Sequence, residues 1–230
     1  MARIAFDDLM EELRGFHPQF SPEAAPPVVV RRFLVRALNN AIGNAAAADP
    51  DTVSESAEVD FKAVVADPSN PRNRIEVSAF RQILGSIRVA RADGHGDGDR
   101  RVEIVSLATQ YPTPFARHVT FPALATRGYS VFELTNPRRV EGYDGETWDD
   151  WDNYQEPLYY DFVPFHRTSD YRGAGAEVEV PDSLQDTVLY SAAVMLAKRG
   201  GLFEYAAALE GQYGQATATN VVAVTEDGER

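Results

Sequence analysis

The chain contains no cysteine, which excludes disulfide bridges, thiolate metal sites and cysteine catalysis together. It also lacks long apolar runs, and no stretch approaches the roughly 20 residues that a membrane-spanning helix needs. The N-terminal residues 1–15 carry acidic side chains where a signal peptide would have an apolar core. We therefore expect a protein that is neither inserted in a membrane nor exported through a signal peptide.

The motifs that would identify a reaction are absent as well. There is no Walker A loop, no Gly-x-Ser-x-Gly nucleophile elbow and no His-Glu-x-x-His zinc motif. None of the four histidines has a second histidine at metal-ligand spacing, which favours surface or loop positions for them. We therefore predict a protein that is not an enzyme and that needs no cofactor.

Basic residues are outnumbered, with 22 lysines and arginines against 35 acidic residues and a net charge of −13. Proteins that bind nucleic-acid phosphates usually carry a clustered basic face, so such binding is not the expected main function. The 230 residues, 44% of them hydrophobic, are enough for one sizeable domain or for a domain with an elaborate insertion.

Residues 178–201 give the clearest helix signal in the chain. Asp182 is placed to act as the N-cap, with Gln185 as its capping-box partner, and Gly200 with Gly201 ends the helix. Apolar residues recur at three- and four-residue spacing, which predicts one buried face. They are Leu184, Val188, Ala192, Met195 and Leu196.

Two further helices are predicted near the N-terminus. Residues 4–14 form a short amphipathic pattern, and residues 28–48 form a long one that follows two prolines and stops at Asp49-Pro50-Asp51. Residues 202–209 are a candidate for one more helical segment near the C-terminus.

The middle of the chain changes from helical to alternating periodicity. The strand-like segments are rich in β-branched residues. They are residues 58–66, 74–80, 85–92, 101–108, 129–134, 158–163 and 177–180. No helical crossover separates them, which favours an antiparallel sandwich or barrel over a parallel sheet.

The predicted fold class is therefore α+β. N-terminal helices and a C-terminal helix form a bundle, an antiparallel β sandwich or barrel-like region is inserted, and an extended C-terminal tail follows. The predicted parts are residues 1–56, 57–180, 181–211 and 212–230.

Residues 93–99 alternate aspartate and glycine and are the one weak candidate for a metal site. Calcium prefers carboxylates on a flexible, glycine-rich backbone, so Asp93, Asp97 and Asp99 are its candidate ligands. The glutamate that ends a twelve-residue calcium loop is missing, and glycine-rich calcium repeats need several copies. Asp-Gly pairs are typical of turns, so we favour a solvated hairpin loop.

Residues 141–161 combine eight acidic residues and six aromatic residues with no basic residue. One hypothesis is a sugar-binding platform that uses Trp148, Trp151 and Tyr154, since aromatic rings stack on sugar faces. A second is a glycosidase carboxylate pair within residues 144–152, although no spacing selects two of the acids. A third is an acidic surface that repels phosphates. For the aromatic rings we favour packing in the interior or between subunits.

The order of these elements resembles the head–tail connector (adaptor or head-completion) proteins of tailed bacteriophages and related gene-transfer particles. In that family a helical pair leads into a variable β region, and the chain returns through a proline and an acidic residue into an Ala- and Leu-rich helix. The matching residues here are Val180, Pro181, Asp182, Leu184, Val188, Leu189, Ala192, Ala193 and Leu196. Residues 129–134 and 159–164 look like the Tyr-rich strands that precede that helix.

The resemblance implies a structural protein of the virion neck, made in the host cytoplasm. Such adaptors form a ring, commonly twelve-fold, that joins the portal to a stopper, nozzle or tail protein and lines a channel for duplex DNA. The helices pack side by side around the ring, here through Leu184, Val188, Leu189, Ala192 and Met195. The C-terminal tail reaches the portal, here with Tyr213, Asn220, Val221, Val222 and Val224.

Elementary physics is compatible with that role. Residues 220–224, NVVAV, have the β propensity that suits addition to an exposed sheet edge. An acidic channel wall would let DNA pass without specific binding, because like charges remove the counterion-release gain. The alternative function is a carbohydrate-binding or baseplate-type β module that uses residues 141–161.

Overall fold

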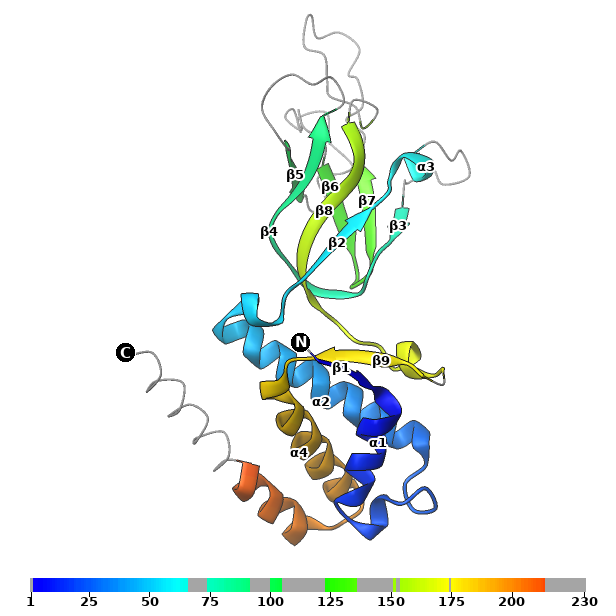
Figure 1. Ribbon diagram of the computed structural model, residues 1–230, viewed down its shortest axis with the longest axis vertical. Coiled ribbons are helices and arrows are strands. Elements are labelled where there is room, and N and C mark those ends of the chain that lie inside the picture. The colour runs from blue at the N-terminus through cyan, green and yellow to red at the C-terminus, as the bar shows by residue number, and fades with distance from the viewer. Residues whose placement is uncertain are drawn as a thin grey trace, which may run out of the picture. The chain divides into compact units, whose positions relative to one another are not determined.

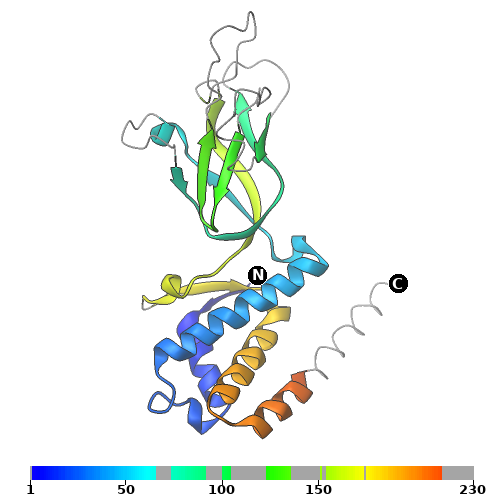
Figure 2. The same ribbon diagram turned by 180° about the vertical axis from the view of Figure 1, so that it is seen from behind.

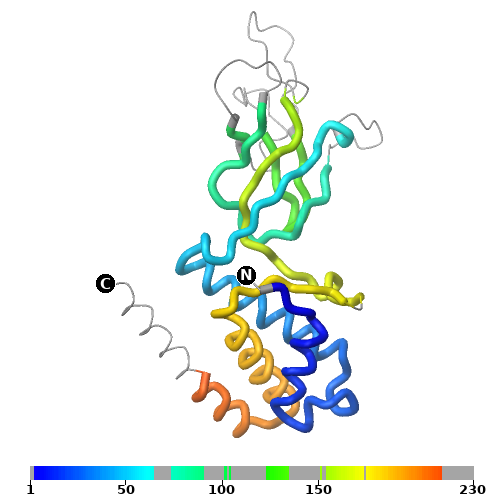
Figure 3. The backbone as a smooth tube through the Cα atoms, viewed as in Figure 1, coloured from blue at the N-terminus to red at the C-terminus, as the bar shows by residue number. Residues whose placement is uncertain are grey.

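The computed structural model describes residues 2–65, 74–91, 100–104, 123–135, 151, 154–173 and 175–213. The chain has the predicted α+β character, with helices and antiparallel sheets. Its contacts divide it into a helical unit, Met1–Val53 with His166–Arg230, and a β unit, Ser54–Phe165 (Figure 1). The backbone leaves the helical unit once and returns once (Figure 3). Residues 166–180, predicted within the β insertion, belong to the helical unit.

Three helices build most of the helical unit. They are α1 (Phe6–Gly15), α2 (Pro27–Ala48) and α4 (Asp182–Arg199), with short 3-10 turns at Pro18–Phe20, Pro50–Val53 and Thr168–Tyr171. α2 packs along α4, and α1 contacts both (Figure 2). The described helices include none with the length and apolar character needed to cross a bilayer.

The predicted helix over residues 4–14 is wrong at its start. Strand β1 (Ala2–Ala5) comes first and pairs antiparallel with β9 (Glu177–Val180). β9 alternates strictly, so that Val178 and Val180 are buried. Because β1 and β9 are distant in the sequence, only tertiary pairing makes this strand, and it overrides the local helical pattern.

The helix predicted over residues 28–48 is confirmed, with α2 beginning one residue earlier at Pro27. Asp182 is not the N-cap of α4: Pro181 takes that position and no side chain caps the helix. The predicted end at Gly200 is confirmed. The amide of Leu202 donates to the carbonyl of Ala197 at 2.9 Å and Gly201 has φ of 76°, the left-handed conformation that glycine adopts readily.

The β unit is one seven-stranded sheet with the order β2-β8-β4-β5-β6-β7-β3. Its strands are β2 (Glu55–Val59), β3 (Arg74–Glu76), β4 (Phe80–Arg91), β5 (Arg100–Ile104), β6 (Ala123–Arg127), β7 (Val131–Thr135) and β8 (Tyr154–Pro164). Neighbours run antiparallel except β5 and β6, which are parallel. Part of the strand predicted over residues 58–66 is instead the short helix α3 (Lys62–Val65).

The sheet is curved (Figure 2). Buried apolar residues of the β unit form one cluster. Every strand of this sheet except β2 contributes a buried residue to the cluster, and β2 packs Ala57 and Val59 against it. The pairing of β4 with β8 shifts its register at a bulge between Leu84 and Arg88, where Gly85 has φ of 58°. Bulges increase local twist, which helps a long strand to follow a curved sheet.

Candidate functional site

In the sequence, the last described segment of the helical unit leads directly into the expected partner-binding tail. Residues 203–213 are helical, beyond the predicted end at residue 209, and follow directly after the turn at Gly201. Ala206 and Leu209 are buried, so one face of this helix belongs to the core of the unit.

Polar and aromatic contacts fix this helix at both ends. The hydroxyl of Tyr205 donates to the carbonyl oxygen of Phe16 at 2.6 Å, and burial raises the pKa of that hydroxyl. Lys198 Nζ donates to Glu210 Oε1 at 2.6 Å. The ring of Tyr213 stacks on that of Tyr190 with centroids 6.4 Å apart. We call these contacts the C-terminal seat, because they hold the helix at the point where residues 214–230 begin.

Large apolar side chains are also exposed on the helical unit. Phe203 is 68% exposed at the start of the C-terminal helix, and Val28 is 55% exposed at the start of α2. A cavity of about 180 Å³ lies between the loop before α2 and the end of α4. It is smaller than the roughly 300–1,000 Å³ of typical ligand pockets. Its size suits a single side chain better than a substrate.

His166 lies at the point where the chain re-enters the helical unit. Its backbone is clamped by Asn39, which donates to the His166 carbonyl at 2.8 Å and accepts from the His166 amide at 2.9 Å. Its Nδ1 lies 2.5 Å from the Tyr171 hydroxyl. Burial lowers the pKa of His166 to about 4, against a smaller opposing effect of Asp170. The imidazole is therefore neutral at physiological pH, and the clamp at this position is made by Asn39 on the His166 backbone.

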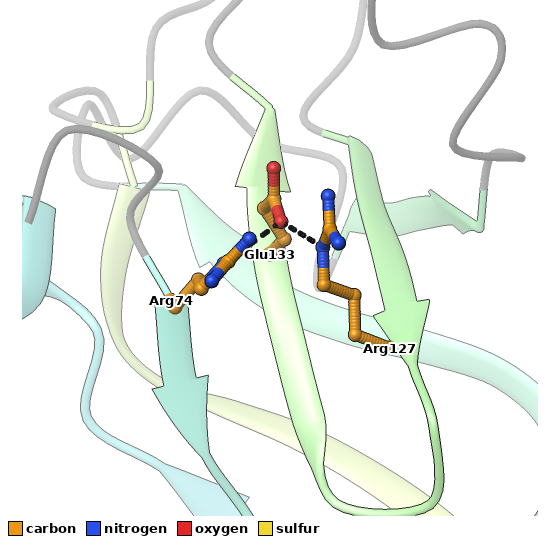
Figure 4. Close-up of polar contacts among 3 residues, drawn as sticks. All are labelled: Arg74, Arg127 and Glu133. Carbon is orange, nitrogen blue, oxygen red and sulfur yellow. Dashed lines mark hydrogen bonds and ion pairs between the residues drawn. The ribbon is translucent and has the colours of Figure 1, made fainter.

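Among the described residues of the β unit one acid is buried, Glu133 on β7. Arg74 on β3 and Arg127 on β6 both reach the same carboxylate oxygen (Figure 4). The Arg74 Nε to Glu133 Oε2 distance is 3.1 Å, and Glu133 is 5% exposed. The two cations offset the cost of burying the carboxylate, so this cluster ties three adjacent strands together.

A shallow hollow of about 340 Å³ lies on the outer face of the sheet over β2, β4 and β8. Tyr159, Glu58 and Arg88 line it, and Ser56 Oγ donates to Asp161 Oδ1 at 2.5 Å within it. Tyr160 faces the opposite way into the core, where burial raises its pKa to about 12. The hollow mixes both charges and selects no single ligand class.

The residues predicted for ring packing divide into two groups. Val188, Leu189 and Ala192 are at most 2% exposed and pack inside their own subunit. Leu184 and Met195 are half-buried and remain candidates for contact with a neighbour. The predicted apolar stripe of α4 is thus mainly an internal core element.

Other predicted site residues are only partly covered. Tyr213 is half-buried against Tyr190, while Asn220, Val221, Val222 and Val224 lie outside the described residues. Asp93, Asp97 and Asp99 lie outside them too. Among the residues that the structure describes, no group of three or more potential ligands could hold a metal ion.

Two of the three aromatic rings proposed for the sugar-binding platform are buried and cannot stack on a sugar. Trp151 and Tyr154 are 0% exposed and pack against each other and, for Trp151, against Phe61. Interior packing is therefore confirmed for these two residues. Trp148 lies outside the described residues.

Sequence reasoning did not find Glu133, the His166 clamp or the C-terminal seat. In β7, Val-Phe-Glu-Leu, strand alternation places Glu133 on the opposite face from the buried Phe132 and Leu134, so the local pattern gave no sign that this acid is buried. The clamp joins Asn39 to a residue 127 positions away, so no local pattern could reveal it. In comparisons with known proteins, no protein-family model and no curated protein matches this chain.

Proposed function

We propose that the chain is the subunit of a head–tail connector, a ring between the portal and the downstream neck or tail of a virion. The observation that carries the proposal is the connectivity of the two units. Both ends of the chain build one helical unit, and the segment between α2 and β9 builds the β unit. The connector family that the sequence resembles has this order of helices, β insertion, returning helix and tail.

In this proposal α1, α2 and α4 form the ring-building bundle, and the curved sheet is the variable, barrel-like insertion. The ring surrounds a channel that duplex DNA crosses without specific binding. The net charge of −13 supports passage without binding, because DNA that contacts acidic subunits gains no binding free energy from counterion release. The protein acts by binding other proteins, and its place is the virion neck.

The C-terminal seat supports a docking role for the tail. Tyr205, Lys198 and Tyr213 hold the last described helix against the rest of the helical unit. Residues 214–230 therefore start from a fixed point on each subunit. In a ring, such fixed starting points would be repeated at regular intervals, as docking to a symmetric portal requires.

The experiment removes residues 214–230 and keeps the whole seat. The full chain and the truncated chain are each mixed with the portal protein encoded in the same genome, and complexes are separated by sedimentation. We expect the truncated chain to lose portal binding while its circular dichroism spectrum and thermal midpoint stay unchanged.

The matched control carries residues 214–230 in shuffled order, which preserves their length and composition. It should bind the portal as poorly as the truncated chain. Undiminished portal binding by the truncated chain would contradict the proposed role of the tail, and failure of the full chain to bind would contradict the connector assignment.

A further inference from the structure

The outward face of α1 is entirely acidic over its first two turns. Phe6, Leu9, Met10 and Leu13 are buried, and this leaves the opposite side of the helix to charged residues. The exposed acids are Asp7, Asp8, Glu11 and Glu12. The one cation of the helix, Arg14, pairs with Glu11 at 2.5 Å.

The outward face of α2 has the opposite sign. Its 22 residues include no acid, and its exposed row at four-residue spacing consists of Val28, Arg32, Arg36 and Asn40. Residues four apart lie one above the other on a helix, so the two guanidinium groups form one continuous basic stripe. Val28, 55% exposed, extends the stripe with an apolar side chain.

Apart from Glu11, the charges on these two faces have no ion-pair partner among the described residues of their own subunit. In the part of the chain that the structure describes, no ion pair joins Asp8 or Glu12 to a base, or Arg32 or Arg36 to an acid. Like charges four residues apart on a helix repel each other. Both helices thus carry an electrostatic cost that an external partner of opposite charge would remove.

We propose that the acidic face of α1 in one copy of this chain docks on the basic face of α2 in the next copy. The inference rests on the proposed ring and names the surfaces that build it. Asp8 and Glu12 have the same four-residue spacing as Arg32 and Arg36, about 6 Å along each helix axis. Two carboxylates can therefore meet two guanidinium groups in one register.

The two faces are different surfaces of the same molecule, which determines the type of assembly. A contact between unlike patches is heterologous, and repetition of a heterologous contact closes into a ring when the rotation allows. A two-fold dimer would require one self-complementary patch instead.

A second copy suits these faces better than nucleic acid does. DNA would have to bind Arg32 and Arg36 on a molecule of net charge −13, within the same helical unit as the acidic face of α1. A second copy of the chain supplies both an acidic and a basic partner surface, and each face then finds its complement.

The test is a charge swap on the full chain. One variant is Arg32→Glu with Arg36→Glu, the second is Asp8→Arg with Glu12→Arg, and the third combines all four changes. The control, Arg88→Glu with Arg101→Glu, reverses two exposed cations on the sheet of the β unit. Self-association is measured by analytical ultracentrifugation up to ~1 mM protein at about 0.01 M ionic strength.

We expect the wild-type chain and the control to self-associate, and each double reversal on α1 or α2 to weaken association roughly tenfold or more. The four-fold swap should restore it, because both faces then carry the opposite sign and still attract. An equimolar mixture of the two double reversals should associate as well. Raising the ionic strength to about 0.1 M, which shortens the screening length from about 30 to about 10 Å, should weaken every association.

Three results would overturn the inference: no wild-type association up to that concentration, double reversals that associate like the wild type, or a four-fold swap that stays dissociated. Retention of duplex DNA by wild type but not by Arg32→Glu/Arg36→Glu, with self-association unchanged, would assign the basic face to phosphates and also overturn it. Portal binding is measured in parallel. If wild type and the four-fold swap bind the portal equally but neither associates through these faces, the inference fails while the connector assignment stands.

Discussion

Replacement of Tyr154 by alanine should greatly lower the free energy of unfolding of the β unit, because the Tyr154 ring lies in its interior. Tyr154 is 0% exposed and lies 6.3 Å from the Trp151 ring between centroids. Truncating a large buried aromatic side chain costs about 3–5 kcal/mol, of which a ring–ring contact accounts for about 0.5–1.5 kcal/mol. Since a domain has about 5–15 kcal/mol in total, Tyr154→Ala should remove roughly a fifth or more of the free energy of unfolding.

The assay is urea and thermal unfolding followed by tryptophan fluorescence. Both tryptophans lie within Ser54–Phe165, so this signal reports on the β unit alone. In a domain of about 100 residues each kcal/mol shifts the midpoint by about 4–8 °C, which predicts a decrease of roughly 12–40 °C. The matched control is Tyr159→Ala on the same strand, 38% exposed, for which we expect a loss of about 1 kcal/mol.

Equal losses in Tyr154→Ala and Tyr159→Ala would refute the placement of Tyr154 in the core. A Tyr154→Ala protein of unchanged stability that loses binding on a glycan array would instead support the sugar-binding alternative. Because the two variants delete the same side chain from one strand, the comparison isolates the effect of burial.

Two further predictions concern charged and titratable groups. Because burial lowers the pKa of His166 to about 4, the unfolded chain binds a proton between pH 6.5 and 4 that the folded chain excludes. The free energy of unfolding should therefore fall as the pH falls through this window, by up to about 3 kcal/mol, and urea titrations should show a smaller fall in His166→Asn. In the β unit, Glu133→Gln should cost about 1–3 kcal/mol, because Arg74 and Arg127 lose their shared carboxylate. Glu76 is an exposed acid on β3, the edge strand that pairs with β7. Glu76→Gln should cost far less, and similar losses in both variants would contradict the role of the cluster.

Elements with strong local signals were predictable from the sequence. α2 has a proline at its first position, a sustained helical period and a Pro-containing stop, and its predicted range differs from Pro27–Ala48 by one residue. The end of α4 at Gly200 was equally readable, since only glycine adopts the left-handed turn at Gly201 without strain.

Elements that depend on distant partners could not be predicted from the sequence. β1 is four residues long and exists because β9 pairs with it, with Arg3 bonded to Glu179 across 176 positions. β6 carries three consecutive buried residues, Ala123, Leu124 and Ala125, and so lacks the alternation that identifies a strand. Asp182 looked like an N-cap, but Pro181 already has the extended conformation that this position requires.

Among the candidate surfaces, too, some features were predictable from the sequence and others were not. Composition drew attention to residues 141–161, and the burial of Trp151 and Tyr154 agrees with the favoured interpretation of their rings. The acidic face of α1 and the basic face of α2 emerge only when exposure is known, because the sequence does not say which charges find partners in the folded chain.

The most direct measurement for the central claim is electron microscopy of the full chain mixed with the portal protein encoded in the same genome. The connector assignment predicts a closed ring of copies stacked coaxially on one end of the portal, with a channel wide enough for duplex DNA. Portal particles that carry no additional ring density, even at high concentrations of the chain, would contradict the connector assignment.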